Sequence, residues 1–444
     1  MITPATPTWN RRVWALAGPI ILANVTVPLL GAVDTAVVGH LPDPRYIGGV
    51  AIGALIFNFV YWGFGFLRMG TTGPTAQAWG ADDPAEIRAM LARALMLAAG
   101  FGVLILLIQA PVGALAFRLL HASAEVEAEA SAYYAIRVWG APAALANYVL
   151  LGWFLGLQNA RWPLVLQIFM NGLNILLDLV FVMGMGWGVE GVAAATLIAE
   201  YTALALGLVL AARRLAMLPE GIAEARIFDG VRFRRMLVVN RDIFIRTLLL
   251  TFSFALFTDR SAQFGNLTLA ANAVLLNLAS ISAFGLDGFA HAAEALVGGA
   301  VGKRKRSDLN GAVRAVMMWG GIIALANAAL FAIAGGLLID LLTGIAEVRA
   351  IARDYLPWVV AMPIISIWCY LYDGIFLGAT RTHEMRNAAL VTTILYVALV
   401  WTLPQLWANH GLWLALIAMN AIRGLTLAAY YPRLARSVGL PRSG

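Results

Sequence analysis

The sequence predicts an all-α polytopic membrane protein, with twelve transmembrane helices in two six-helix pseudo-symmetric bundles. The composition supports this prediction, because 61% of the 444 residues are hydrophobic and only 12% are charged. A mean hydropathy of +0.80 exceeds what a water-soluble domain tolerates. Apolar segments of about 20 residues, the length that crosses a bilayer core of roughly 30 Å, recur along the chain, and the two halves of the sequence resemble each other.

Twelve such segments account for nearly the whole chain. A β-barrel is excluded, because its strands would alternate apolar and polar residues, whereas residues 95–117 are almost continuously apolar. The first apolar run has full length and no small-residue cleavage site behind it, so we expect it to be retained as a helix. The predicted segments begin near Val13, Ile47, Met90, Tyr133, Pro163, Gly188, Asp242, Leu269, Ala312, Tyr355, Ala388 and Gly411.

The basic residues predict the orientation. They concentrate at the termini and in every second loop, so the positive-inside rule predicts a multi-pass protein with both termini in the cytoplasm. The net charge of +7 therefore requires no nucleic acid partner. The basic run at residues 303–306 is interpreted as a topology signal, with attraction of anionic lipid as the alternative. The basic positions are Arg11, Arg12, Arg88, Arg93, Arg161, residues 213–241, residues 303–306, Arg381, Arg386, Arg433, Arg436 and Arg442.

An internal repeat relates the two halves. The motif GxFLG occurs at residues 152–156 and again at residues 374–378, and residues 51–80 align without a gap with residues 270–299. Six helices per half is an even number, so both halves should enter the membrane in the same sense, related by an axis along the membrane normal with a cleft between them. We expect an N-terminal lobe at residues 1–217, a cytoplasmic basic linker at residues 218–238 and a C-terminal lobe at residues 239–444.

Polar residues inside the apolar segments mark a candidate ion site. Asp34 lies deep in the first segment, where an acid is costly and therefore predicted to be functional. Asn171, Asn174 and Asp178 share one helical face by their spacing of three and four residues, and Thr196 shares a face with Glu200. Two carboxylates with amide and hydroxyl oxygens can surround a small cation or share one proton. In the alternative interpretation the amides join helices by hydrogen bonds and Asp178 pairs with an arginine.

Four long motifs resemble the multidrug and toxic compound extrusion (MATE) family, and within it most closely the DNA-damage-inducible F (DinF) branch. The resemblance extends over essentially the whole chain. The motifs are NVTVPLLGAVDTAVVGHL from Asn24, LRMGTTGPTAQAWGA from Leu67, NARWPLVLQIFMNGLNILLDLVFVMGMGWGVEGVAAATLIAEY from Asn159 and CYLYDGIFLGATRTHEMRN from Cys369.

The resemblance implies a MATE/MOP-type fold and a secondary antiporter that exports amphipathic, often cationic small molecules in exchange for H⁺ or Na⁺ by alternating access. Such a protein needs no cofactor beyond the transported coupling ion and contacts substrates and the lipids of a bacterial inner membrane. One chain with two pseudo-symmetric halves is sufficient for alternating access, so we expect a functional monomer. The sequence shows no metal-ligand cluster and no nucleophile–base arrangement, so we expect that the protein is not an enzyme. The alternatives are a lipid-linked precursor flippase of the same superfamily and a non-transporting receptor or scaffold. Which ion couples transport is left open.

The resemblance also implies residue roles. The cation or proton site, including a possible Na⁺ site, is implied at Asp34, Asn174, Asp178 and Thr196. Pro19 lies where bending of the first helix is implied, because proline removes a backbone hydrogen bond; a static kink is the alternative.

The second half carries its own polar residues. Asp287, His291 and Glu294 belong to a polar stripe on the eighth segment, and Asp373 lies in the tenth. We expect Asp287 and Asp373 to contribute to a path for cationic substrates, while Arg68 and Arg246 neutralise neighbouring carboxylates, with a structural ion-pair network as the alternative. His291 is interpreted as a helix contact rather than a proton relay. Asn171 and Glu200 complete the candidate network.

Near the second and third segments, Asp83 and Pro84 predict a helix start, with an acidic N-cap followed by proline in the first turn.

Overall fold

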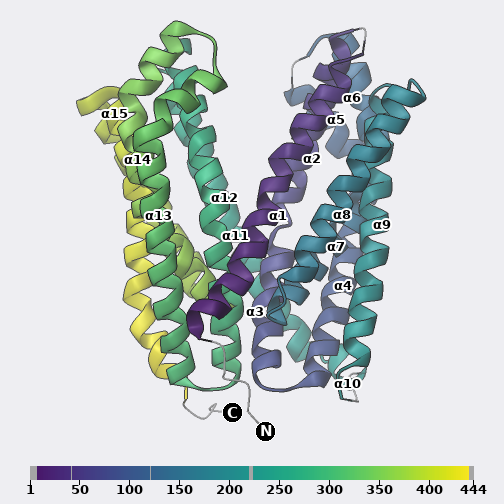
Figure 1. Cartoon of the computed structure of the whole chain (residues 1–444), viewed down its shortest axis with the longest axis vertical. Coiled ribbons are helices and arrows are strands. Elements are labelled where there is room, and N and C mark those ends of the chain that lie inside the picture. The colour runs from purple at the N-terminus through teal and green to yellow at the C-terminus, as the bar shows by residue number, and fades with distance from the viewer. Residues whose placement is uncertain (1–7, 42, 121, 220–223, 440–444) are drawn as a thin grey trace. The chain divides into compact units, whose positions relative to one another are not determined.

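The computed structural model describes residues 8–41, 43–120, 122–219 and 224–439, with the side chains of residues 27–29, 32, 35, 224 and 225 excepted. Within these ranges the regular structure is helical throughout and contains no strand (Figure 1). The elements in chain order are α1 (Trp9–Val38), α2 (Arg45–Gly63), α3 (Phe66–Gly80), α4 (Pro84–Leu107), α5 (Gln109–Leu119), α6 (Ala124–Arg137), η1 (Val138–Gly140), α7 (Ala141–Gly156), α8 (Arg161–Asp178), η2 (Leu179–Gly184), α9 (Val189–Ala216), α10 (Glu224–Ile227), α11 (Gly230–Ala262), α12 (Asn266–Gly302), α13 (Arg306–Leu342), α14 (Ala346–Gly378) and α15 (Thr382–Ser437).

The helices confirm the predicted all-α membrane fold. Nine helical spans among the described residues are long and apolar enough to cross a bilayer, and α1 and α11 cover the first and seventh predicted segments. The last span, α15, contains the two final segments. They are separated at Trp407 and Ala408, where the backbone leaves the helical conformation and Ala408 has φ +46°. Each of the twelve predicted segments therefore begins within a helix or at its N-cap.

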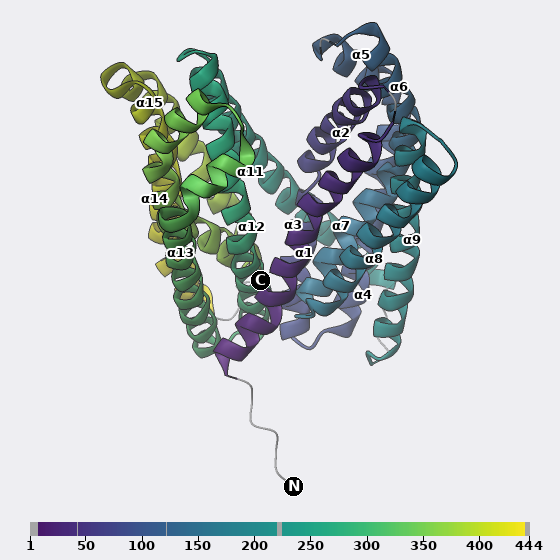
Figure 2. The same ribbon diagram turned by 45° about the horizontal axis from the view of Figure 1, so that its top comes forward.

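The chain divides into two compact units. One consists of Met1–Ile21, Ala76–Ala81 and Leu237–Gly444, and the other of Leu22–Thr75 and Asp82–Met236. In the first unit α12, α13, α14 and α15 pack side by side (Figure 2) around a core that includes Phe257, Tyr396 and Trp413. In the second unit α4 packs on α7, and α8 packs on α9.

The repeated glycine motif makes the same kind of contact in both units. A Cβ atom on Gly152 would lie 2.4 Å from the carbonyl oxygen of Arg68 in α3, and one on Gly374 would lie 2.2 Å from that of Ala290 in α12. Only glycine permits the two backbones to approach this closely. The internal repeat seen in the sequence therefore corresponds to a repeated helix contact.

The region between the sixth and seventh segments is more ordered than the sequence suggested. Residues 218–238 were predicted as a linker, with the next helix starting near Asp242, but this stretch contains α10 and α11 begins at Gly230. Residues 220–223 lie outside the described residues. The helix extends early because Asp229 accepts hydrogen bonds from the backbone N–H groups of Val231 and Arg232, at 2.9 and 3.2 Å, and so caps it.

The predicted start of the third span is confirmed. Asp83 is the N-cap of α4, its carboxylate accepts a hydrogen bond from the backbone N–H of Glu86 at 3.2 Å, and Pro84 follows in the first turn. Asp83 also accepts two hydrogen bonds from Arg226 of α10, at 2.6 and 2.7 Å. The N-cap therefore also holds α10 against α4.

Candidate functional site

Two aspartates meet in the unit that contains α8 and α9. Asp34 comes from α1 and Asp178 from the last position of α8, and their carboxyl groups lie close enough to interact with each other. Asp178 is fully buried and Asp34 is half-buried. The Oδ1 atom of each has no hydrogen-bond partner and is shielded from solvent. Two neighbouring carboxylates in a shielded site resist ionising together, so the pair favours holding one shared proton.

Asn174 links this pair to α9. In the amide orientation that satisfies both of its ends, the nitrogen donates to Oδ2 of Asp178 at 2.9 Å and the oxygen accepts from the hydroxyl of Thr196 at 2.9 Å. Asn174 is 1% exposed. The four residues of the expected cation site, Asp34, Asn174, Asp178 and Thr196, therefore form one connected cluster. Among the described residues no arginine forms an ion pair with Asp178, in contrast to the alternative interpretation.

The donor set can be compared with what a sodium ion requires. A hard cation takes oxygen ligands, and this cluster contains two carboxylates, one amide and one hydroxyl. In the orientation described, however, Asn174 presents its N–H group to Asp178 and directs its oxygen toward Thr196. The cluster therefore offers oxygen ligands for Na⁺ when the Asn174 oxygen faces the aspartates, and its two carboxylates can equally share one proton.

Asn171 lies one turn before Asn174 and contacts α1. Its amide nitrogen donates to the hydroxyl of Thr26 at 2.8 Å, and its oxygen accepts from Gln167 at 3.1 Å. Asn171 thus joins α8 to α1 between Pro19 and Asp34. Thr26 was not identified from the sequence, although its position in the first apolar run was visible.

Glu200, the other acid of α9, pairs with Arg137. The guanidinium donates to both carboxylate oxygens at 2.5 and 2.8 Å, and each residue is 7% exposed. Arg137 also lies over the rings of Phe57 and Tyr61, 5.4 Å from each centroid, and it interacts electrostatically with Asp34. Sequence reasoning missed Arg137, although an arginine five residues into an apolar segment that begins near Tyr133 is the kind of signal that marked Asp34.

Pro19, the expected hinge, lies inside α1. This helix is continuous from Trp9 to Val38. The residues of α1 up to Ile21 belong to one compact unit, and those from Leu22 onward belong to the other. Pro19 therefore lies two residues before the last residue of α1 in the first of these units.

Asp373 occupies a separate cluster in the other unit. It forms an ion pair with Arg246, and the Nη2 atom of Arg423 lies 3.7 Å from its Oδ2 atom. Arg423 is 4% exposed, and it also donates to the Sγ atom of Cys369 at 2.9 Å. Arg246 is thus placed on a carboxylate, as anticipated, and Arg423 is a second cation that sequence reasoning missed.

The remaining predicted residues lie on α12 and α3. On α12, Glu294 is fully buried, while Asp287 and His291 are half-buried. Asp287 lies close enough to Tyr370 of α14 to interact with it electrostatically. Arg68 is half-buried on α3 and interacts with Tyr148 of α7.

Comparison with known proteins gives concordant matches. Residues 19–180 and 243–402 match the MatE family model. The DNA damage-inducible protein F of Escherichia coli (strain K12) is 45% identical over 426 residues, which cover 96% of this chain and 92% of that protein. A probable multidrug resistance protein NorM of Bacillus cereus is 24% identical and covers 90% of each chain. A solved outward-facing multidrug resistance MATE family transporter of the MOP superfamily superimposes with a TM-score of 0.87 at 18% identity, over 98% of both chains. A MOP superfamily transporter from Pyrococcus furiosus gives the same values.

Proposed function

The chain belongs to the MatE family, a family of membrane transporters, and from this premise we propose that it exports amphipathic, often cationic small molecules in exchange for protons. This membership confirms the resemblance found in the sequence. It is also consistent with the expectation that the protein is not an enzyme. The observation that carries the proposal is the meeting of the carboxyl groups of Asp34 and Asp178 in a shielded site, because two carboxylates placed together favour sharing one proton.

The coupling step follows from charge. When the pair holds one proton, Asp34 and Asp178 attract each other through the shared hydrogen bond; when the proton leaves, two like charges face each other in a buried site and repel. α1 carries Asp34 and α8 carries Asp178, so loss of the proton favours a different position of α1. Two arrangements of one helix, each preferred in one protonation state, supply what alternating access requires.

Pro19 supplies the place where α1 can bend. Proline removes a backbone hydrogen bond from the helix and weakens it there. In this proposal the lobes at residues 1–217 and 239–444 rock against each other while α1 bends near Pro19. Full transport by Pro19→Ala would show instead that this proline makes only a static kink.

The substrate class is inferred from the family. Relatives such as NorM are named as multidrug resistance proteins, which favours amphipathic drug-like compounds over the lipid-linked precursors that a flippase would carry. We propose that Asp287 contributes to the path of cationic substrates, whereas Asp373, paired with Arg246 and close to Arg423, belongs to the ion-pair network given as the alternative. We also propose that the protein works as a monomer in a bacterial inner membrane, with both termini in the cytoplasm.

Efflux from proteoliposomes tests the proposal. A cationic dye is loaded, pH and sodium gradients are imposed separately, and dye efflux is measured alongside the translocation of a labelled lipid. Wild-type protein should export dye under the pH gradient alone, and Asp34→Asn and Asp178→Asn should each abolish coupled efflux while inserting normally. Asp308→Asn is the matched control, because Asp308 lies outside the aspartate cluster, makes a long, partly exposed contact with Lys303 at 4.0 Å and interacts electrostatically with Arg12.

Efflux driven by sodium alone would show that the cluster binds Na⁺ instead. Lipid translocation without dye efflux would support the flippase. Drug resistance equal to wild type in both aspartate variants, at equal expression, would contradict a coupling role for the pair.

A further inference from the structure

Helix α3 contributes residues to both compact units. Its residues up to Thr75 belong to the unit that contains the aspartate pair, whereas Ala76–Ala81 belong to the other unit. The helix is nevertheless continuous from Phe66 to Gly80, and Pro74 lies inside it. A movement of the two units relative to each other must therefore bend α3 or release one of its ends.

The first part of α3 is held by α7 of its own unit. A Cβ atom on Gly156 would lie 2.8 Å from the carbonyl oxygen of Thr72 and 2.6 Å from the Cβ atom of Thr75. A Cβ atom on Gly152 would likewise collide with the carbonyl oxygen of Arg68. The two helices approach each other as closely as glycine permits, so this part of α3 moves with α7.

The last turn of α3 is held by α12 and by the end of α14, which belong to the same unit as that turn. The side-chain amide of Gln77 donates to the backbone carbonyl of Gly378 at 2.9 Å and to the hydroxyl of Thr380 at 3.1 Å. A Cβ atom on Gly80 would collide with the carbonyl oxygen of Gly299 in α12. The end of α3 therefore moves with α12 and α14.

The two sets of contacts lie only two residues apart, at Thr75 and Gln77, so any bending of α3 is confined to the turn beside them. This turn, residues 70–74, has the sequence GTTGP, and glycine and proline have the lowest helix propensities. Pro74 has no N–H group, so the carbonyl of Gly70 receives no hydrogen bond from the residue four positions later. One of the bonds that would stiffen this turn is therefore missing.

Two threonines weaken the same turn. The hydroxyls of Thr71 and Thr72 donate to the backbone carbonyls four residues earlier, at 2.7 and 2.9 Å. Such side-chain bonds compete with the backbone ladder and often bend a helix. The helix is therefore easiest to bend beside the point where its neighbours change from one unit to the other.

The internal repeat provides a comparison for this turn. Residues 70–74 align with residues 289–293 of α12, whose sequence FAHAA contains neither glycine nor proline. All residues of α12 belong to one unit. The proline is thus present in the helix that contributes to both units, and alanine takes its place in the helix that contributes to one.

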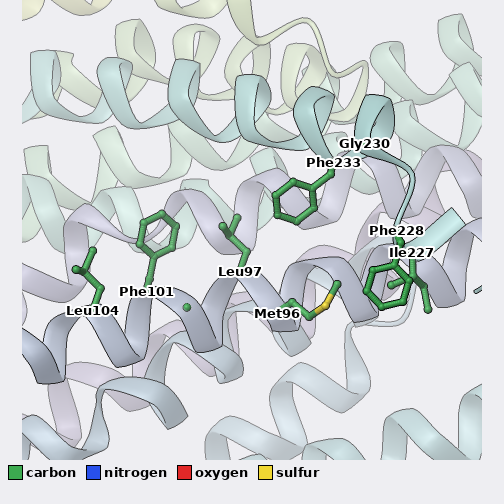
Figure 3. A pocket seen from close by; sticks show the side chains of 9 residues that line it. Met96, Leu97, Phe101, Leu104, Ile227, Phe228, Gly230 and Phe233 are labelled. Carbon is green, nitrogen blue, oxygen red and sulfur yellow. The ribbon is translucent and has the colours of Figure 1, made fainter.

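The helix α11 also contributes to both units, because its residues up to Met236 belong to one and those from Leu237 onward belong to the other. It contains no proline and no glycine after Gly230. Its first turns border an apolar pocket of about 590 Å³ against α4, lined by Phe233 from α11 and Leu97 from α4 (Figure 3). This pocket leaves room for the start of α11 to shift without bending, whereas both parts of α3 are in close contact with their neighbours.

We propose that residues 70–74 form a hinge at which α3 bends when the two units move relative to each other during transport. This inference rests on the proposed alternating access, and it adds a second bending point to the one proposed at Pro19 in α1. The hinge lets each end of α3 stay packed on its own unit while the direction of the helix changes.

Single-molecule fluorescence transfer tests the hinge. Donor and acceptor dyes are attached through Ala128→Cys in α6 and Gln405→Cys in α15, two exposed positions in different units. The natural cysteine, Cys369, is fully buried and should remain unlabelled. The rate of exchange between distances is measured for full-length protein in lipid nanodiscs with tetraphenylphosphonium, a non-fluorescent amphipathic cation, and efflux of a cationic dye is measured in proteoliposomes.

The wild-type protein should exchange between two distances. Pro74→Ala restores the missing N–H group, so bending must break an additional backbone hydrogen bond, and exchange and efflux should both slow about five- to tenfold. Pro74→Gly restores the same N–H group but keeps a flexible backbone, so its exchange should stay closer to wild type. Pro357→Ala is the matched control and should exchange like wild type, because it makes the same change inside α14, whose residues all belong to one unit.

Exchange at the wild-type rate in Pro74→Ala would overturn the hinge and leave the transport proposal intact. Slower exchange in Pro74→Gly than in Pro74→Ala would also overturn it, because glycine removes more of the side chain and the proline would then act by filling space. A single distance in the wild-type protein with and without the cation would instead contradict alternating access itself.

Discussion

Replacing Glu200 by glutamine leaves the Arg137 guanidinium buried without its counter-charge. Replacing Arg137 by glutamine likewise leaves the Glu200 carboxylate buried without a counter-charge. The two side chains make two hydrogen bonds of 2.5 and 2.8 Å, and each residue is 7% exposed. Breaking a buried pair by removing one partner costs about 3–5 kcal/mol, whereas neutralising both partners costs less because no charge remains unpaired. We therefore expect each single variant to be less stable than the double variant.

Thermal unfolding of the purified protein measures this difference. A loss of 3–5 kcal/mol in a unit of this size corresponds to a fall in the unfolding temperature of roughly 6–20 °C. The control is Asp340→Asn, which breaks the exposed pair with Arg353 at 2.6 Å and should cost under about 1 kcal/mol. If the double variant lost as much stability as the two single variants added together, the reasoning from buried charge would be refuted.

Three further predictions concern other parts of the molecule. Asn272→Ala leaves the buried amide of Asn409 without its hydrogen-bond partners at 2.7 and 3.0 Å. The free energy of unfolding should fall by about 1–3 kcal/mol for each buried polar group left unpaired, and an unchanged unfolding curve would argue against this. Gly374→Ala should cost about 1–3 kcal/mol in the same assay through overpacking, because its Cβ would lie 2.2 Å from a carbonyl oxygen of α12, and wild-type stability would show that the helices can separate freely. Burial raises the pKa of Asp83, but hydrogen bonds from Arg226 and the α4 backbone outweigh it and hold this pKa below its usual value. The ionised Asp83 carboxylate therefore stabilises the contact between α10 and α4 at neutral pH, and this stabilisation is lost as pH falls below about 4. Hydrogen exchange in α10 should be faster in Asp83→Asn than in the wild-type protein at pH 7. Equal rates at pH 7 would contradict this prediction.

Hydrophobic length and the internal repeat were sufficient to predict the helices. Each apolar segment became helical because a backbone in lipid must satisfy its own hydrogen bonds. The GxFLG motif indicated the internal repeat, and the structure adds that its first glycine marks a close helix contact in each unit. The early start of α11 was not predicted, because its first turns carry arginines whose partners, Glu86 among them, lie on α4 about 150 residues earlier in the chain.

Helical spacing placed Asn174 and Asp178 on one face of α8, but the grouping of these residues with Asp34 of α1 and Thr196 of α9 was implied by the resemblance to the MATE family. The ion pairs of Arg137 with Glu200 and of Arg423 with Asp373 could not, because each joins two helices that are far apart in the sequence. Spacing along one helix reveals a shared face, but which face meets which neighbour is decided by packing.

The account depends on Asp34 and Asp178 sharing a proton that is given up when substrate binds. A pH indicator dye, added with substrate to purified protein in weakly buffered detergent, measures that exchange directly. We predict that substrate releases protons from the wild-type protein and releases none from Asp34→Asn or Asp178→Asn. Proton release of wild-type size from both variants, or no release from the wild-type protein at saturating substrate, would contradict the account.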